Sequence, residues 1–239
     1  MMAIAIVTIT FGQAKMATHS DKAAQAVNFA ADAPTLLYSQ MNAGQGTAIA
    51  SQIFPDFGNC ALQGADDFTV PGGGWTIVRV EVIGTYSFHP GPANSFDVFF
   101  YADNAGAPGA QVYHGAGLAY GVNGSIFGVD LTTPAALAPG NYWVSVTPTM
   151  SLGVGGQWFW QSHVSPLIGN EFHWQDPCNL VTSFTTWTTA SVAFPTYGIT
   201  DFCFALYGTS ATVPVSDWAL FIGLGLIVAF TVIRFRKAA

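Results

Sequence analysis

The feature that most constrains this sequence is a repeated alternation of apolar and polar residues with a period of two. Between Thr76 and Val82, three valines alternate with Arg79 and Glu81. This period is that of a β-strand with one buried face and one solvated face. The same alternation predicts strands at 96–101, 142–146 and 202–207, and more weakly at 111–114, 126–131, 158–161 and 192–194.

Turn-forming residues separate the predicted strands. Pro and Gly cluster at 71–74, 90–92, 108–109 and 139–140, and helical periodicity is nearly absent before the C-terminal segment. Short strands without intervening helices bury their apolar faces against a second sheet. We therefore expect an all-β fold, an antiparallel β-sandwich or jelly roll, over residues 35–208. Residues 15–34 follow neither period strongly and are expected to form a flexible lead-in.

The C-terminal region has the pattern of a membrane anchor. Residues 218–233 carry no charge, and Arg234, Arg236 and Lys237 follow them. A helix over 218–235 would be roughly 27 Å long, near the hydrocarbon thickness of a bilayer. A buried helix of the fold is the alternative, although a run that is apolar on all sides fits a core poorly. The basic residues place the tail 236–239 in the cytoplasm and the β-domain outside, with 209–217 as linker and sorting motif.

The N-terminus gives a second indication of export. Residues 1–11 are apolar, and Gly12 and Ala14 offer the small residues that a signal peptidase reads. A basic region before the apolar run is missing, so the signal peptide predicted at 1–14 is either weak or truncated. An N-terminal strand of the domain is the alternative.

The chain has three cysteines, Cys60, Cys178 and Cys203. Their number agrees with an oxidising compartment, and none has the C-x-x-C spacing of a metal or redox site. Because Cys178 and Cys203 flank the same late strand region, we expect a disulfide between them. Cys60 would then be free or paired between chains, although its Gly-rich loop could also reach either of the other two.

Charge and motif content exclude several classes of function. The net charge is -7 with only 6 Lys and Arg, which argues against nucleic-acid binding because phosphates require clustered cations. The common hydrolase, zinc-protease and nucleotide-binding motifs are missing. Glu171 and His173 would share one side of a strand as an acid/base or metal pair, but two such groups do not make a site. We therefore expect no catalytic centre and no cofactor: the chain is predicted not to be an enzyme.

Two groups of side chains are weaker candidates for binding. Asp66, Asp67 and Asp103 could supply oxygen ligands to Ca²⁺, or could instead fix a strand entry and a hairpin turn.

The second group is aromatic. Trp158 and Trp160 share one face of a predicted strand and, with Trp174, could form a flat platform for sugar rings. If that face is the core, the same tryptophans serve packing, which is the interpretation we favour.

The residues around the predicted anchor resemble a known sorting signal. The sequence runs from Val213 and Pro214 through Ser216, Asp217 and Trp218 into the apolar segment and ends in Arg234, Arg236 and Lys237. This order resembles the tripartite C-terminal signals of the PEP-CTERM type. The resemblance implies secretion, recognition by an exosortase-like membrane protease, and release or re-anchoring at the surface of a Gram-negative bacterium.

The middle of the chain resembles a β-sandwich module that recurs in such exported proteins, through the phrases at 65–71, 98–104, 137–146 and 153–158. This resemblance implies a fold and a location, and no activity. We expect a non-enzymatic cell-surface or extracellular-matrix protein. The alternative is a carbohydrate-binding module that acts in exopolysaccharide.

Overall fold

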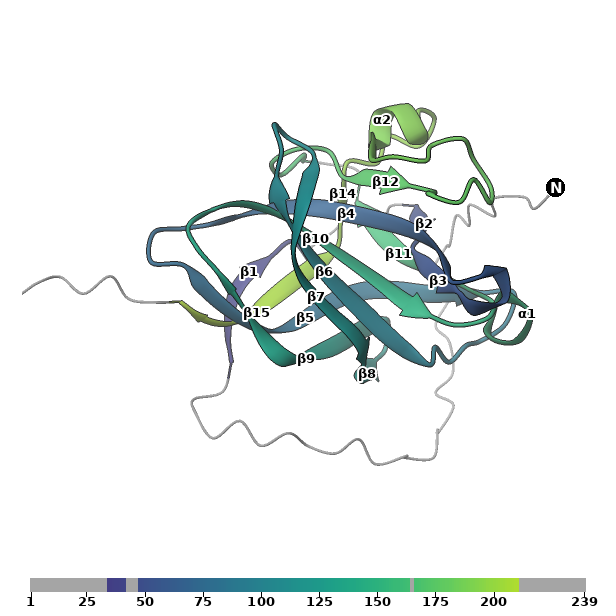
Figure 1. The fold of residues 1–239 in the computed structure, drawn as a ribbon, viewed down its shortest axis with the longest axis horizontal. Helices are drawn as coiled ribbons and strands as arrows, with labels where there is room; N and C mark the ends of the chain where they lie inside the picture. The colour runs from purple at the N-terminus through teal and green to yellow at the C-terminus, as the bar shows by residue number, and fades with distance from the viewer. Residues whose placement is uncertain (1–33, 42–46, 164–165, 211–239) are drawn as a thin grey trace, which may run out of the picture.

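The computed structural model describes residues 34–41, 47–163 and 166–210, which form two β-sheets (Figure 1). The first sheet has the order β1–β15–β5–β11–β14, with β2 paired to β11 and β9 paired to both β5 and β8. Its strands are β1 (Thr35–Ser39), β2 (Ala48–Ala50), β5 (Trp75–Ser87), β8 (Tyr120–Asn123), β9 (Ile126–Leu137), β11 (Gln157–His163), β14 (Asp201–Phe202) and β15 (Phe204–Ser210).

The second sheet has the order β13–β12–β4–β3–β10–β6–β7. Its strands are β3 (Gln52–Phe54), β4 (Cys60–Val70), β6 (Ser95–Asp103), β7 (Pro108–Leu118), β10 (Gly140–Thr149), β12 (His173–Gln175) and β13 (Thr188–Thr189). Three short helices connect them: η1 (Pro55–Phe57), α1 (Leu152–Gly155) and α2 (Ala190–Ala193). The pairings are antiparallel except β10 with β3, so the predicted all-β class is confirmed for the described residues.

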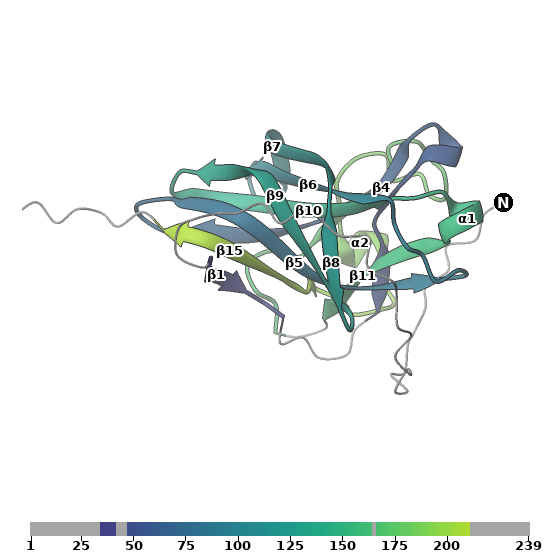
Figure 2. The ribbon, with the colours of Figure 1, turned by 90° about the horizontal axis from the view of Figure 1, so that it is seen from below.

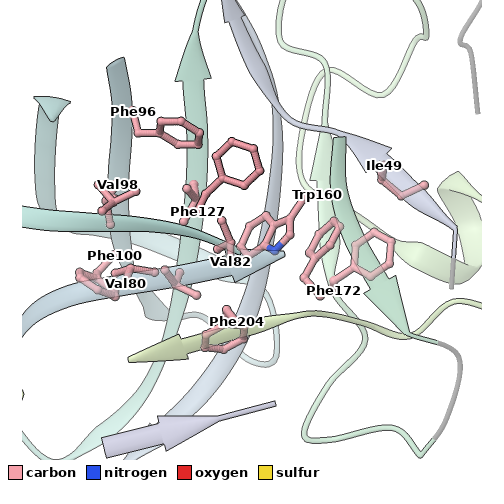
Figure 3. Packing of buried hydrophobic residues seen from close by; sticks show 14 of the residues in the cluster. Ile49, Val80, Val82, Phe96, Val98, Phe100, Phe127, Trp160, Phe172 and Phe204 are labelled. Carbon is pink, nitrogen blue, oxygen red and sulfur yellow. The ribbon is translucent and has the colours of Figure 1, made fainter. Parts of the chain in front are cut away.

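An aromatic core joins the two sheets. Phe68 of β4 stacks on Trp75 of β5 at 6.1 Å between ring centroids and meets Phe204 of β15 at 6.3 Å. Phe96 of β6 lies edge-on to Trp158 of β11 at 5.5 Å. Figure 2 shows β6 and β10 in one layer and β1 and β15 in the other, and Figure 3 shows the buried side chains between them. Each buried side chain of this size contributes about 1.5–3 kcal/mol of hydrophobic stabilisation.

Strand β5 confirms the alternating pattern and corrects it at one residue. Val80 and Val82 are fully buried, while Arg79 and Glu81 remain partly exposed on the outer face. A register shift opposite β9 falls between Ile77 and Arg79. A β-bulge at this point moves Val78 off the core face and brings Ile77 onto it.

Two other expectations about local structure were wrong. Residues 192 and 193 are the last two of α2, and Phe194 follows the helix, so none of them lies in a strand. Strand β4 was not predicted by alternation, because the adjacent polar residues Asp66 and Asp67 interrupt the period of two, although both are buried. Asp66 and Asp67 accordingly lie within β4 and not at a strand entry.

The predicted export elements lie outside the described residues. These are the signal peptide 1–14, nearly all of the lead-in 15–34, the sorting motif from Val213 to Trp218, the apolar segment 218–235 and the basic tail. Within residues 34–41, 47–163 and 166–210, no helix has the length and hydrophobicity required to span a membrane.

Candidate functional sites

The disulfide joins Cys60 to Cys178, so the predicted Cys178–Cys203 pairing was wrong. Strand β12 pairs antiparallel with β4, and Gln175 lies opposite Gln63. Cys178 lies three residues after Gln175, and Cys60 lies three residues before Gln63. The Cα atoms of these two bonded cysteines are 6.0 Å apart. The register of two strands far apart in sequence therefore sets the pairing.

Cys203 is a buried free thiol between β14 and β15. Burial, with the nearby charges of Asp66 and Asp201, raises the pKa of this thiol to about 12. A thiol that stays protonated at neutral pH is a poor nucleophile. Cys203 therefore belongs to the core and does not act as a reactive cysteine.

The three tryptophans of the predicted sugar platform are core residues. Trp158, Trp160 and Trp174 expose at most 1% of their surface. Trp160 lies among the buried side chains of the core (Figure 3). It stacks on Phe202 at 4.4 Å between ring centroids, and its Nε1–H donates to the carbonyl of Cys203 at 2.9 Å. The platform interpretation is wrong for these residues, because both their faces are covered by other side chains; the packing interpretation is confirmed.

The side chains of Glu171 and His173 do not bond each other, although the Nδ1 of His173 lies 3.2 Å from the backbone carbonyl oxygen of Glu171. The carboxylate of Glu171 accepts the backbone N–H of Ser191 at 2.9 Å, whereas the imidazole of His173 lies edge-on to Trp143 at 4.8 Å. Burial lowers the pKa of His173. The carboxylate of Glu171 thus binds the backbone of α2, whereas the imidazole of His173 packs against Trp143 of β10.

The candidate calcium ligands Asp66, Asp67 and Asp103 are each held by N–H donors. Asp67 accepts both the backbone N–H and the side-chain amide of Asn170, the latter at 2.8 Å. Asp103 accepts the indole N–H of Trp143 at 2.9 Å and lies at the β6–β7 hairpin turn, as the alternative interpretation expected. Among the described residues, no three His, Cys, Asp or Glu side chains gather as a metal site.

Asp66 lies at the centre of a buried polar network. Its Oδ2 accepts the side-chain amide of Gln40 at 2.6 Å and the backbone N–H of Phe202 at 2.5 Å. The hydroxyl of Tyr38 donates to the Oε1 of Gln40 at 2.5 Å, which extends the network to β1. Desolvation, followed by the charge of Asp201, raises the pKa of Asp66 well above its ordinary value. The group therefore retains its proton to a higher pH when the protein is folded.

A pH dependence of stability follows from this shift. Because the folded-state pKa of Asp66 is raised, its contribution to stability is full below the pKa of the unfolded chain, about 4, and is lost as the pH rises through the folded-state value. We expect the free energy of unfolding to fall by up to about 1.4 kcal/mol per pH unit over this window. Urea unfolding of the wild type and Asp66→Asn between pH 4 and 8 measures the slope.

The asparagine variant should show a flatter profile than the wild type. Asp56→Asn is the matched control, since Asp56 is exposed. If Asp66→Asn keeps the wild-type slope, the shift of Asp66 does not control stability.

A groove lies on the outer face of the first sheet, across β5, β9 and β8. Its volume is about 290 Å³. We call it the Arg79 groove; it is lined by Arg79, Glu81, Gly121, Val122, Asn123, Ile126 and Gly128. The guanidinium of Arg79 bonds Glu81 Oε1 at 3.0 Å and Asp130 Oδ1 at 2.8 Å, and the Tyr207 hydroxyl donates to Glu81 Oε2 at 2.9 Å.

The sequence did not indicate this groove, because Arg79 and Glu81 alone have the appearance of a solvated strand face. Its floor comes from pairings across strands: Glu81 lies opposite Gly128, and Gly128 lies opposite Gly121. The available signal was a glycine within each of two apolar segments, since glycine inside a strand often marks a close approach.

Comparisons with known proteins give no further indication of the site's role. No protein-family model, no curated protein and no solved structure matches this chain.

Proposed function

We propose that this chain is a non-enzymatic exported protein of the cell surface or extracellular matrix. The observation that carries the proposal is the Cys60–Cys178 disulfide. Structural disulfides persist in oxidising compartments outside the cytosol. The bond closes across the second sheet, from the first residue of β4 to the loop after β12, so the folded domain depends on oxidation for part of its stability.

The location of the polar side chains supports the non-enzymatic part of the proposal. The carboxylates of Asp66, Asp67 and Asp103 and the imidazole of His173 all contact groups of the fold itself. Side chains used in this way hold strands and loops in place. They are not arranged as a nucleophile, base and orienting group around a pocket.

The sorting route is part of the same proposal. The segment 218–235 is the anchor, and the basic residues Arg234, Arg236 and Lys237 at its C-terminal end hold it in the membrane. The motif from Val213 to Trp218 is read by an exosortase-like protease. The partners are thus the protease, the membrane and, at the surface, extracellular polysaccharide. The finer architecture, a jelly roll carried on one transmembrane helix, belongs to this proposal as well.

Mass spectrometry tests the route directly. The full chain is expressed in a Gram-negative host that carries an exosortase-like protease, and the protein is extracted from the cell surface. We expect a chain that ends between Val213 and Trp218 and whose Cys60–Cys178 bond is found by non-reducing peptide mapping. Replacing Arg234, Arg236 and Lys237 by glutamine leaves the β-domain unchanged and should abolish processing.

Two results would contradict the proposal in different ways. A mature surface protein that still ends at Ala239 would exclude processing and leave simple anchoring. Protein found only in the cytoplasm, with reduced cysteines, would exclude export.

A further inference from the structure

We infer that the Arg79 groove is a binding site for a neutral saccharide. The inference rests on the proposed function for its setting, because a surface or matrix protein meets extracellular polysaccharide. It deepens that function by naming what the protein would hold and where. The site is separate from the buried tryptophans, which lie in the core between the sheets.

Gly121 is the first argument, since nothing in the fold requires a glycine there. Its φ does not lie in the left-handed region, and a Cβ added to it would meet no atom within 4 Å. Glycine inside a strand costs stability relative to alanine, so a glycine without a structural reason points to a surface that must stay open. The open surface is the floor of the groove.

Gly128 is the second argument, and here the fold does use the glycine. A Cβ at this position would come within 1.9 Å of Nη2 of Arg79. The missing side chain thus lets the guanidinium lie close to the backbone of Gly128 while it bonds Glu81 and Asp130. Two carboxylates hold the guanidinium of Arg79 in place in the unliganded protein, which reduces the side-chain entropy lost when a ligand binds.

The charges select the class of ligand. Arg79, Glu81 and Asp130 together carry a net charge of -1, so an anionic ligand would be repelled, and a simple cation would meet Arg79 beside the carboxylates. A sugar hydroxyl both donates and accepts. It can therefore use the carboxylate oxygens and the remaining guanidinium N–H groups together, and the amide of Asn123 offers both functions as well.

The size and the apolar part of the groove fit the same class. Ile126 lies opposite Asn123 of β8 and Ile83 of β5, so its side chain shares the outer face with the polar groups of the groove. The aliphatic side chain of Ile126 can cover the C–H face of a pyranose while the hydroxyls of the sugar reach Arg79 and Asn123. A volume of about 290 Å³ is at the lower end of the range for small-molecule sites, which suits a short stretch of a glycan chain.

Isothermal titration calorimetry of the full chain tests the inference, in a detergent without a sugar headgroup. The probes are neutral tetrasaccharides of glucose (α-1,4 and β-1,4), mannose, galactose and N-acetylglucosamine, with tetragalacturonate as the anionic comparison. We expect at least one neutral probe to bind with a Kd between about 10 µM and 1 mM. Tetragalacturonate should bind at least tenfold more weakly.

Variants locate the binding. Gly121→Val fills the floor with a residue that strands favour, so the fold should be as stable as the wild type while the Kd rises at least tenfold. Gly72→Val is the matched control, because Gly72 also has open space at its Cβ position and lies in the β4–β5 turn. Arg79→Lys keeps the positive charge but removes the planar guanidinium and its several N–H donors, so it should also weaken binding at least tenfold.

Each contrary result overturns the inference. No binding of any neutral probe below 10 mM, tighter binding of tetragalacturonate, or unchanged affinity in Gly121→Val would each do so. Because the assay uses purified protein, these outcomes are independent of whether the chain is exported or processed, so the proposed function stands or falls by its own experiment.

Discussion

Trp160→Ala is expected to lower the free energy of unfolding by about 3–5 kcal/mol, the usual cost of removing a buried indole. The ring is fully buried and stacks on Phe202 at 4.4 Å. Its Nε1–H also bonds the carbonyl of Cys203, so the substitution leaves a cavity and a buried acceptor without its donor. Urea denaturation, followed by circular dichroism, measures the loss.

Trp187→Ala is the control for this prediction. Trp187 is only partly buried, and its ring centroid lies 5.5 Å from that of Tyr101. Its removal should therefore lower the free energy of unfolding clearly less than the removal of Trp160. A Trp160→Ala variant that unfolds at the wild-type urea concentration would contradict the assignment of Trp160 to the core.

Removing the disulfide is expected to cost a comparable amount. The bonded cysteines are separated by 118 positions, and the chain-entropy model assigns about 4.7 kcal/mol to closing a loop of about 100 residues. We expect the double variant Cys60→Ser, Cys178→Ser to lose about 2–5 kcal/mol, the range found for native disulfides of small secreted domains. Urea denaturation of both proteins under oxidising conditions gives the difference.

The third cysteine provides the control. Cys203→Ala removes one buried sulfur without opening a loop, and its effect should be smaller than that of the double variant. Addition of a reductant should destabilise the wild type and Cys203→Ala, and should leave the double variant unchanged. Equal stability of the wild type with and without reductant would contradict a structural role for the bond.

Alternation in the sequence identified strands with one buried face, such as β5, and also β6 and β10, which are buried on both faces. The segments around Val80, Val98, Val144 and Phe204 became parts of β5, β6, β10 and β15. The same signal could not find β4, because the adjacent buried carboxylates of Asp66 and Asp67 interrupt its alternation. It also could not find the bulge at the start of β5, because a bulge depends on the partner strand.

The candidate sites show the same division between local and long-range information. Trp158 and Trp160 lie on one face of a strand, as the spacing predicted, but only the position of the second sheet decides that this face is the core. Cys60 meets Cys178 through the β4–β12 register. The Arg79 groove requires two glycines from different strands to become neighbours, and no local pattern places them together.

Strand β15 lies between β1 and β5, and the described chain ends with it at Ser210, opposite Trp75. A pull on the chain from beyond Ser210 acts along this strand. The ladder hydrogen bonds run perpendicular to it, so they share the load in shear and do not open one after another. Arg79 and Glu81 lie on the neighbouring strand that receives this force. If the proposed anchor tethers the domain at this end, tension loads β15 in shear against both β1 and β5, the direction in which paired strands resist separation most strongly.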